Sequence, residues 1–539
     1  MNFNNLILTI LIAIPALGAV IVSIPGIVKG NAIRVFTLGV AIVDFVVGLP
    51  LIFLFDSRAQ TAGVNQSWQF EANTPWIKAF GINYHVGIDG VGLLLVQLTT
   101  LLSIIAVLAG WSSIQTRLRE YHVVLLLLQV GTLGVFTSLD LFLFYIYFEL
   151  VLIPMALLIG IWGSQNRVYA AVKFFLYTLV GSVLMLVAII ALYIASAGAN
   201  GGVATTDLPT LTRIMQGVVS GQNGGLGGAL GTTFQNLIFL GFAGAFAIKV
   251  PLWPLHTWLP DAHVQAPTAG SVILAGTLLK LGGYGFLRFA IPLAPIGAAT
   301  FQGLMIALSL IAIIYGALVS LVQPDLKKLV AYSSVSHMGF VVLGLFTFTQ
   351  QGIDGAVLQM VSHGLLTGGL FFCVGVVYER LHTRDIAAMG GMAYRMPIYA
   401  AMFGVLMLGS LGLPGISGFL GEFLVFLGAF NYAPFVAAIA SIVIIIAPFY
   451  LMWMFQRAVF SKPKASSEGF PDLRLHEAMG IITLVVLAIG MGVYPLPLFQ
   501  TIAQPDANLM LASQQAATAL VNSHEQIPVL AWLMQVVGR

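Results

Sequence analysis

The feature that most constrains this chain is a series of long apolar segments that follow one another through 539 residues. A helix that crosses a bilayer needs about 20 predominantly apolar residues. Fourteen segments meet this requirement, at approximately 5–25, 33–55, 88–110, 122–138, 140–162, 170–197, 235–258, 267–290, 300–321, 329–348, 354–378, 397–430, 433–456 and 478–500. The sequence therefore predicts an all-α polytopic membrane protein with about 14 transmembrane helices.

Composition excludes several other classes of protein. Charged residues make up 8% of the chain and hydrophobic ones 59%, whereas about a quarter of the residues of a soluble domain are charged. The net charge of +3 is too small for a nucleic-acid binder. One cysteine, Cys373, excludes a disulfide framework, a cysteine zinc site and an iron–sulfur cluster held by this chain alone. The first segment lacks a basic n-region, so we expect it to be retained as a membrane span.

The distribution of basic residues predicts the orientation, because short cytoplasmic loops are enriched in Lys and Arg. Loops after even-numbered spans hold four basic residues at most, which are Arg58, Lys78, Arg213 and Arg288. Loops after odd-numbered spans hold fourteen, which are Lys29, Arg34, Arg117, Arg119, Arg167, Lys327, Lys328, Arg380, Arg384, Arg395, Arg457, Lys462, Lys464 and Arg474. We therefore expect both termini outside and the odd-numbered loops in the cytoplasm.

Two spans contain residues that interrupt a helix. Span 235–258 carries Pro251 and Pro254, and Pro260 follows shortly after. Proline removes a backbone donor and clashes with the preceding turn. Span 397–430 is 34 residues long and has a glycine-rich centre. As a continuous helix it would be about 51 Å long, against a hydrocarbon core of roughly 30 Å. Both spans are expected to be broken.

The two broken spans lie five spans apart, which predicts internal repeats. Paired interrupted helices in corresponding positions indicate a transporter site built from repeats, and an odd number of spans per repeat would invert the second copy. We expect a first five-helix repeat at 122–290 (spans 4–8) and an inverted second repeat at 300–456 (spans 9–13), each forming a half-channel. Residues 1–110 would add three helices, and 478–539 a last span and a short tail. Two unrelated proline kinks are the alternative.

Six ionisable residues fall near the middle of predicted spans, where such groups are costly and indicate function. They are Glu149, Lys249, Lys280, His337, His363 and Glu422. Because a change in the separation of Glu149 and Lys249 would alter the proton affinity of both, we favour a switchable proton site over a fixed ion pair. Lys280 and Glu422 suggest a wet interior path. For the two histidines, a role in proton transfer and simple hydrogen bonding to a neighbour are equally favoured.

Other polar residues suggest structural roles. Lys173 could extend to the cytoplasmic interface or pair with Glu149, with the first slightly favoured. Asp44 is interpreted as a helix-contact residue. The loop after span 7 holds one carboxylate between two histidines, in the order His256, Asp261 and His263. Because no third nitrogen ligand lies nearby, we favour a hydrogen-bonded joint over a metal site. The GGLGGALG run at 224–231 follows no strand, so we expect a flexible loop rather than a nucleotide site.

Several stretches resemble a known family. They run in chain order from span 5 to span 12, and they read YFELVLIPM, AIKVPLWPLHTWLPDAHVQAPTAGSVILAG, LLKLGGYG, AYSSVSHMGF, HGLLTGGLFF, YERLHTRDI and GLPGISGFLGEF. This pattern resembles the antiporter-like proton-channel subunits of respiratory complex I, the NADH:quinone oxidoreductase, and in particular the M-type (chain 4). The wider superfamily includes subunits of sodium/proton antiporters and membrane hydrogenases.

The resemblance implies fourteen helices with two inverted repeats, and it implies roles for the six residues. Glu149 and Lys249 would be the modulating pair, Lys280 with His337 and His363 the central relay, and Glu422 the terminal site. A glutamate at position 422 is typical of the M-type, since the L- and N-types generally have lysine there. The tail is too short for the lateral helix of the L-type.

The resemblance also implies cofactors and partners. Proton translocation would be coupled to NADH oxidation and quinone reduction, with FMN, iron–sulfur clusters and quinone in partner subunits and none in this chain. Neighbouring L- and N-type subunits and membrane lipids are the expected contacts, and no nucleic acid is expected as a partner. We expect a bacterial inner membrane as the location. A sodium/proton antiporter subunit, a membrane-hydrogenase subunit and a structural scaffold are the alternatives.

Overall fold

A computed structural model of the chain describes residues 3–57, 68–464 and 470–522. Arg58 and the end of the tail, 523–539, lie outside the described residues. Within them, twelve helical segments are long and apolar enough to cross a membrane. Ten of these are α1 (Phe3–Ser23), α2 (Ala32–Leu54), α3 (Gly90–Ala109), α4 (Leu118–Thr137), α7 (Arg167–Ala199), α15 (Gln302–Leu321), α16 (Leu326–Phe346), α17 (Gln350–Leu381), α21 (Pro434–Phe455) and α22 (Leu475–Val493).

The other two crossing segments are the predicted spans 5 and 8. Each is an irregular helix, and the sequence did not reveal the irregularities. Span 5 consists of α5 (Leu141–Leu150) and α6 (Leu152–Trp162), interrupted at Val151. Span 8 runs through α11 (Thr268–Ile273), a π-helical turn at Leu274–Leu278, α12 (Leu279–Gly285), a second π-helical turn at Phe286–Ala290 and α13 (Ile291–Leu293). Such π-helical insertions are often found at functional sites.

The two predicted helix breaks are confirmed. Span 7 consists of α9 (Thr232–Lys249) and α10 (Trp258–Gln265), separated by the proline-rich turns at 250–257. Span 12 consists of α19 (Pro397–Ser410) and α20 (Ser417–Tyr432). Between these halves Gly412 and Gly415 have φ angles of +81° and +93°, which glycine adopts without strain. The two broken spans and the twelve segments together make fourteen crossings, as predicted.

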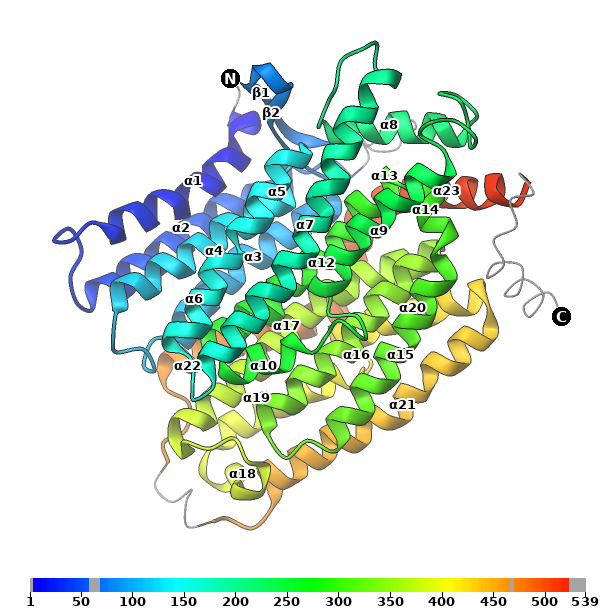
Figure 1. Cartoon of the computed structure of the whole chain (residues 1–539). Coiled ribbons are helices and arrows are strands. Elements are labelled where there is room, and N and C mark those ends of the chain that lie inside the picture. The colour runs from blue at the N-terminus through cyan, green and yellow to red at the C-terminus, as the bar shows by residue number, and fades with distance from the viewer. Residues whose placement is uncertain (1–2, 58–67, 465–469, 523–539) are drawn as a thin grey trace.

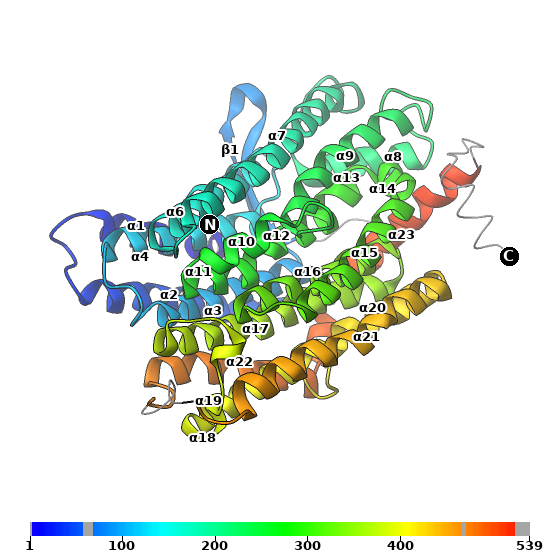
Figure 2. The ribbon, with the colours of Figure 1, turned by 60° about the horizontal axis from the view of Figure 1, so that its bottom comes forward.

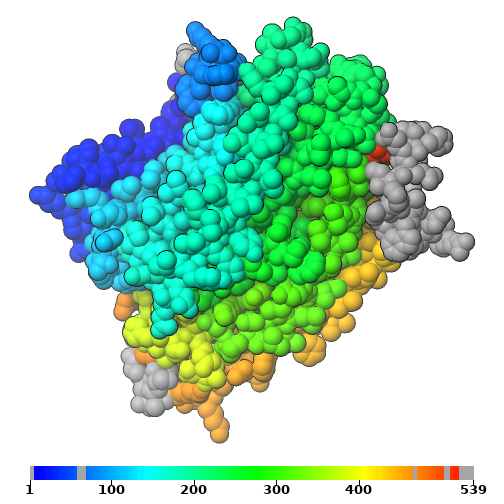
Figure 3. Space-filling view, in the orientation of Figure 1, coloured from blue at the N-terminus to red at the C-terminus, as the bar shows by residue number. Residues whose placement is uncertain are grey.

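The helices lie side by side in a bundle whose colours run broadly in chain order, except that α22 and α23 pack against α3 and α17 (Figures 1 and 3). The central helices are fully enclosed, because every residue in the apolar window of both span 8 and α17 is buried. The outer helices instead expose large apolar side chains, among them Leu17, Phe53, Ile194 and Phe449. An apolar outer surface is stable in lipid and not in water, and the chain is a multi-pass membrane protein.

One end of the bundle carries the basic loops, including those with Arg117, Lys328 and Arg384, and is called the basic end below. The short elements Ile386–Ala388, α18 (Met392–Arg395) and the π-helical turn Gln456–Phe460 lie there (Figures 1 and 2). The opposite end is more structured than we expected. The interruption at 56–87 holds a hairpin of β1 (Gln69–Ile77) and β2 (Ile82–Ile88), joined through a 3-10 turn at Lys78–Phe80.

Two helices also cover the opposite end (Figure 1). The loop at 198–234 contains α8 (Leu208–Val219), although its glycine run at 224–231 is loop, as predicted. The tail expected to be short forms α23 (Leu496–Asn522), which packs on α14 (Pro295–Thr300) and α17. The buried side chains of Ser513 and Ala516 show why a weakly amphipathic sequence forms a helix here: tertiary contacts stabilise it.

A buried histidine fastens the hairpin to α8. His85 lies between two carboxylates, with Nδ1 at 2.7 Å from Asp207 and Nε2 at 2.8 Å from Glu71. Asp207 also caps the N-terminus of α8. Burial disfavours the charged ring, but the hydrogen bonds and charges of the two carboxylates outweigh it and raise the pKa of His85 to about 9. The hairpin and α8 are therefore held by a charged, hydrogen-bonded joint at neutral pH.

Candidate functional site

Four of the six predicted residues form a continuous line through the centre of the bundle. Lys280 Nζ lies 2.7 Å from His363 Nδ1. The rings of His363 and His337 are 5.9 Å apart, centroid to centroid. His337 Nδ1 then lies 2.8 Å from Oε1 of Glu422. The line thus joins span 8, α17, α16 and α20, and all but Glu422 are buried.

The local structure of span 8 orients Lys280. The ammonium also donates to the carbonyl of Ala275, which lies in the π-helical turn. The contact with His363 Nδ1 allows either group to hold the proton, because the donor and acceptor roles of the ring nitrogens depend on the tautomer. Nε2 has no hydrogen-bond partner among the described residues. The lysine and histidine are therefore arranged as a donor and acceptor between which a proton can pass.

The break in span 12 places Glu422 at the other end of the line. Gln359, which sequence reasoning missed, donates from Nε2 to Glu422 Oε1 at 3.2 Å. A small cavity of about 10 Å³ lies between Glu422, His363 and Ser410. This volume accommodates about one water molecule. The carboxylate therefore has two protein hydrogen-bond donors and adjoins a water-sized space.

The other two predicted residues are separate from this line. Lys249 is buried and its Nζ has no hydrogen-bond partner among the described residues. It lies over the rings of Phe148 (4.9 Å) and Phe174 (5.7 Å). Glu149 adjoins the interruption at Val151, and the described residues contain no ion pair between it and Lys249 within 4.0 Å. The two residues are thus not in direct contact, although the charge of Glu149 acts on Lys249.

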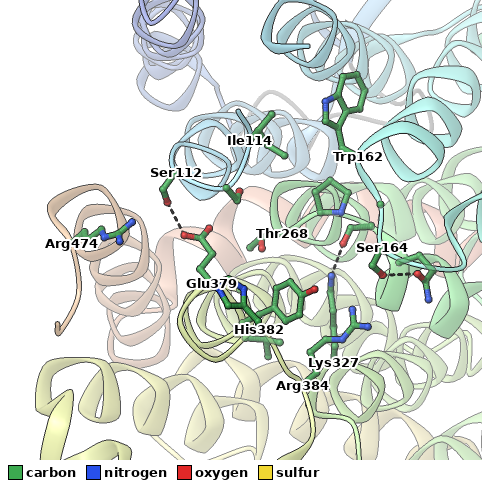
Figure 4. Close-up of a pocket in the computed structure, with 18 residues that line it drawn as sticks. Ser112, Ile114, Trp162, Ser164, Thr268, Lys327, Glu379, His382, Arg384 and Arg474 are labelled. Carbon is green, nitrogen blue, oxygen red and sulfur yellow. Dashed lines mark hydrogen bonds between the residues drawn. The ribbon is translucent and has the colours of Figure 1, made fainter. Parts of the chain in front are cut away.

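At the basic end, a cavity of about 460 Å³ extends to the start of span 8 (Figure 4). Lys327 and Thr268 line it, with Glu379, which accepts a hydrogen bond from Ser112. Lys327 was assigned to a loop, but its side chain is buried and Nζ donates to the carbonyl of Ala266 at 2.6 Å. Because the helix is broken here, that carbonyl has no intrahelical donor. The prolines of this region therefore indicated that a carbonyl would need another donor.

The interpretation of His263 as part of a hydrogen-bonded joint was wrong. Its ring is fully buried, stacks on Phe371 at 4.2 Å, and has no hydrogen bond at either nitrogen among the described residues. Among them there is also no group of three or more metal-ligating side chains. The charges of Lys327 and Lys280 both act on His263, so it is a further ionisable residue of this region.

The positions of three other charged residues were also predicted. The structure confirms one of these predictions and contradicts two. Lys173 neither extends freely nor pairs with Glu149, but forms an ion pair with Asp261 at 2.7 Å. Asp44 accepts a hydrogen bond from Gln129, which confirms a contact between α2 and α4. Arg288, counted with the loop residues, is 1% exposed and forms an ion pair with Asp89 inside the protein.

The fold and the site together define a class: a polytopic helical protein with two broken helices and a buried row of titratable side chains, as in antiporter-like membrane subunits. The family described as "NADH:quinone oxidoreductase/Mrp antiporter, TM" matches residues 138–447. The chain belongs to this family and, within it, to the M-type.

Individual relatives support this assignment. The chain is 47% identical to NADH-quinone oxidoreductase subunit M of Rhodobacter capsulatus, covering 85% of this chain and 86% of the relative. It is 42% identical to NADH-ubiquinone oxidoreductase chain 4 of Chondrus crispus over 94% and 98% of the two chains.

Solved structures agree. A chain of respiratory complex I from Thermus thermophilus is 31% identical, with a TM-score of 0.81 over 95% of this chain and all of that one. A chain of the Mrp complex from Dietzia sp. has a TM-score of 0.79 over 96% of this chain and all of that one. At 18% identity, the second similarity concerns the fold alone. Such relatives place the chain in a multi-subunit complex.

Proposed function

We propose that this chain is a proton-translocating membrane subunit of an NADH:quinone oxidoreductase. The observation that carries the proposal is the direct line from Lys280 through His363 and His337 to Glu422. Lys280 with His363, and His337 with Glu422, are within hydrogen-bond distance and can exchange protons directly. The two histidine rings, 5.9 Å apart between centroids, complete the row through a bridging water or a rotation of a ring. The M-type relatives are subunits of NADH–quinone oxidoreductases, which indicates the enzyme to which the movement of protons is coupled.

We also propose a direction of transfer, which assumes the two half-channels expected at 122–290 and 300–456. A proton from the basic end reaches Lys249 through the first half, passes to Lys280 and the histidines, and leaves from Glu422 through the second. Burial of Lys249 on two aromatic rings keeps it in a low-dielectric site, where the distance to an acidic partner strongly affects its charge.

The lack of direct contact between Glu149 and Lys249 supports a switching role. A closed ion pair would hold the proton on Lys249, and separation would release it toward Lys280. The interruption at Val151 gives α5 and α6 a joint beside Glu149, at which the carboxylate can move. In this proposal a neighbouring subunit drives that movement.

The setting of the chain is part of the same proposal. The basic end faces the cytoplasm and both termini lie on the periplasmic side of a bacterial inner membrane. L-type and N-type subunits flank the chain in the membrane, while FMN, iron–sulfur clusters and quinone belong to partner subunits.

The site is tested by comparing two carboxylates that each accept a hydrogen bond from a glutamine amide. Glu422 accepts from Gln359 on the line, and Asp44 accepts from Gln129 away from it. In the assembled enzyme in proteoliposomes, Glu422→Gln should lower the protons pumped per NADH, and Asp44→Asn should not. Equal pumping in the wild type and Glu422→Gln would refute a role for this line.

The assembly is tested by gentle purification of the tagged chain. Recovery with flavin, iron–sulfur signals and NADH–quinone activity is expected. Recovery with small membrane proteins and no redox centre would instead assign the chain to a sodium/proton antiporter, the alternative compatible with the Mrp fold.

A further inference from the structure

The two ends of span 8 differ in their access to water. Its first residue, Thr268, lines the basic-end cavity. Its other end holds Arg288, which is 1% exposed and forms an ion pair with Asp89, the N-cap of α3. Lys280 lies between these ends. Span 8 therefore adjoins a cavity at one end and a buried charged pair at the other, with Lys280 between them.

Lys280, Tyr284 and Arg288 follow one another along span 8 toward the opposite end. Lys280 and Tyr284 share a face of α12, and the π-helical turn at Phe286–Ala290 then carries the helix on to Arg288. The Tyr284 hydroxyl donates to the carbonyl of Phe136 at 3.1 Å. A Cβ on Gly92 would lie 3.2 Å from that same oxygen, so α3 begins beside it. Without Arg288, the tyrosine hydroxyl and the Asp89 carboxylate would continue the titratable line from Lys280 toward the outside.

Aromatic rings close the space around this column. Tyr284 packs edge-on against Phe136 at 5.2 Å and against Phe289 at 6.2 Å. Phe289 in turn lies 3.8 Å from Phe144. All four side chains are buried. Water has little room among these rings, and a proton could cross here only on side chains.

The Arg288–Asp89 pair is not explained by stability alone. Burying two charges costs about as much as their attraction returns, and apolar replacements of such pairs are often neutral or stabilising. The Nε and Nη1 atoms of Arg288 have no hydrogen-bond partner among the described residues. An incompletely bonded cation at this position calls for another role.

We propose that Arg288, held in place by Asp89, is a barrier that prevents protons on Lys280 from leaking to the opposite side of the membrane. This inference rests on the proposed function. A guanidinium stays protonated throughout the physiological range, so it cannot accept a proton and pass it on. Its positive charge also repels an approaching proton, as arginine does in other pores. Asp89 fixes the barrier, and Arg288 keeps Asp89 from becoming the next acceptor.

The test compares two variants that break the same ion pair. Arg288→Met removes the cation and leaves a carboxylate that can carry a proton, whereas Asp89→Asn leaves the cation. Passive proton permeability is measured in proteoliposomes of the assembled enzyme, after an imposed pH step and without NADH. Arg288→Met should leak about tenfold faster than the wild type. A charge about 12 Å from Lys280 changes the free energy of a proton there by an amount that corresponds to roughly a tenfold change in rate. Asp89→Asn should remain tight.

The control is a second buried ion pair. Arg380 and Glu477 form it at the basic end, with side chains 5% and 2% exposed. Arg380→Met should leave the leak unchanged. Should Arg288→Met fail to assemble, Arg288→Gln removes the same charge while keeping a hydrogen-bond donor for Asp89.

The proposal would be overturned if the passive proton permeability of the Arg288 variants equalled that of the wild type. Equal leaks in Arg288→Met and Asp89→Asn would also overturn it, because the loss of packing would then be the cause. Failure here is distinct from failure of the proposed function. The leak needs no turnover, whereas the role of the central line is judged by pumping in Glu422→Gln.

Discussion

Lys280 and His363 are in direct contact, Nζ to Nδ1 at 2.7 Å, although 83 residues separate them in the chain. Span 8 and α17 approach closely enough because both helices have glycine at the crossing. A Cβ on Gly364 would lie 3.0 Å from the carbonyl of Gly276 and 2.7 Å from Leu98. The contact between the two ionisable groups thus depends on the absence of a side chain at Gly364, whereas a Cβ on Gly276 would meet Leu102 of α3.

Replacement of Lys280 by arginine should abolish proton transfer while keeping the charge. Arg remains protonated at any physiological pH, so the site would be occupied by a cation that releases no proton. We expect the protons pumped per NADH to fall at least to the level of Glu422→Gln, with assembly retained. Wild-type pumping in Lys280→Arg would show that the lysine acts only through its charge.

Replacement of Gly364 by alanine should separate span 8 from α17. The added methyl group meets backbone as well as Leu98, and overpacking of this kind costs about 1–3 kcal/mol. We expect a lower unfolding temperature and weaker pumping. The matched control is Gly39→Ala in α2, where a Cβ has no neighbour within 4 Å. This change should be neutral or slightly stabilising, since alanine favours the helix by about 1 kcal/mol. Equal effects of the two changes would contradict the close-approach argument.

Replacement of Glu149 by glutamine should uncouple the proposed switch. The amide has nearly the same shape as the carboxylate but no charge, so its distance from Lys249 would no longer set the lysine's proton affinity. We expect fewer protons per NADH and slower coupled NADH oxidation, both measured in proteoliposomes. If both quantities stay at wild-type values, the two residues do not form the switch.

The hairpin should become less stable at alkaline pH. The folded pKa of His85, about 9, lies above its ordinary value of 6.5. Its contribution is therefore complete below about pH 6.5 and is lost as the pH rises through about 9. Because Glu71 is half-exposed, we expect only about 1–2 kcal/mol. Hydrogen exchange in β1 and β2, corrected for intrinsic rates, should show this loss in the wild type. His85→Gln should show no such dependence, and an identical pH profile in both proteins would exclude His85 as its source.

The number of spans, the breaks in spans 7 and 12 and the six mid-membrane ionisable residues could all be predicted from the sequence. Each depends on local chemistry. Apolar length decides whether a segment can cross a bilayer, proline and glycine decide where a helix ends, and the high cost of a charge in lipid makes each one conspicuous.

Only the tertiary structure decided which of these groups meet. The contact of Lys280 with His363, the separation of Glu149 from Lys249 and the burial of Arg288 depend on how helices distant in the chain pack. The π-helical turns of span 8 and the helix α23 likewise have no strong local signal. Side-chain partners across a bundle are set by crossing position and rotation, which the apolar pattern of a membrane helix scarcely records, because lipid and protein interior are equally apolar.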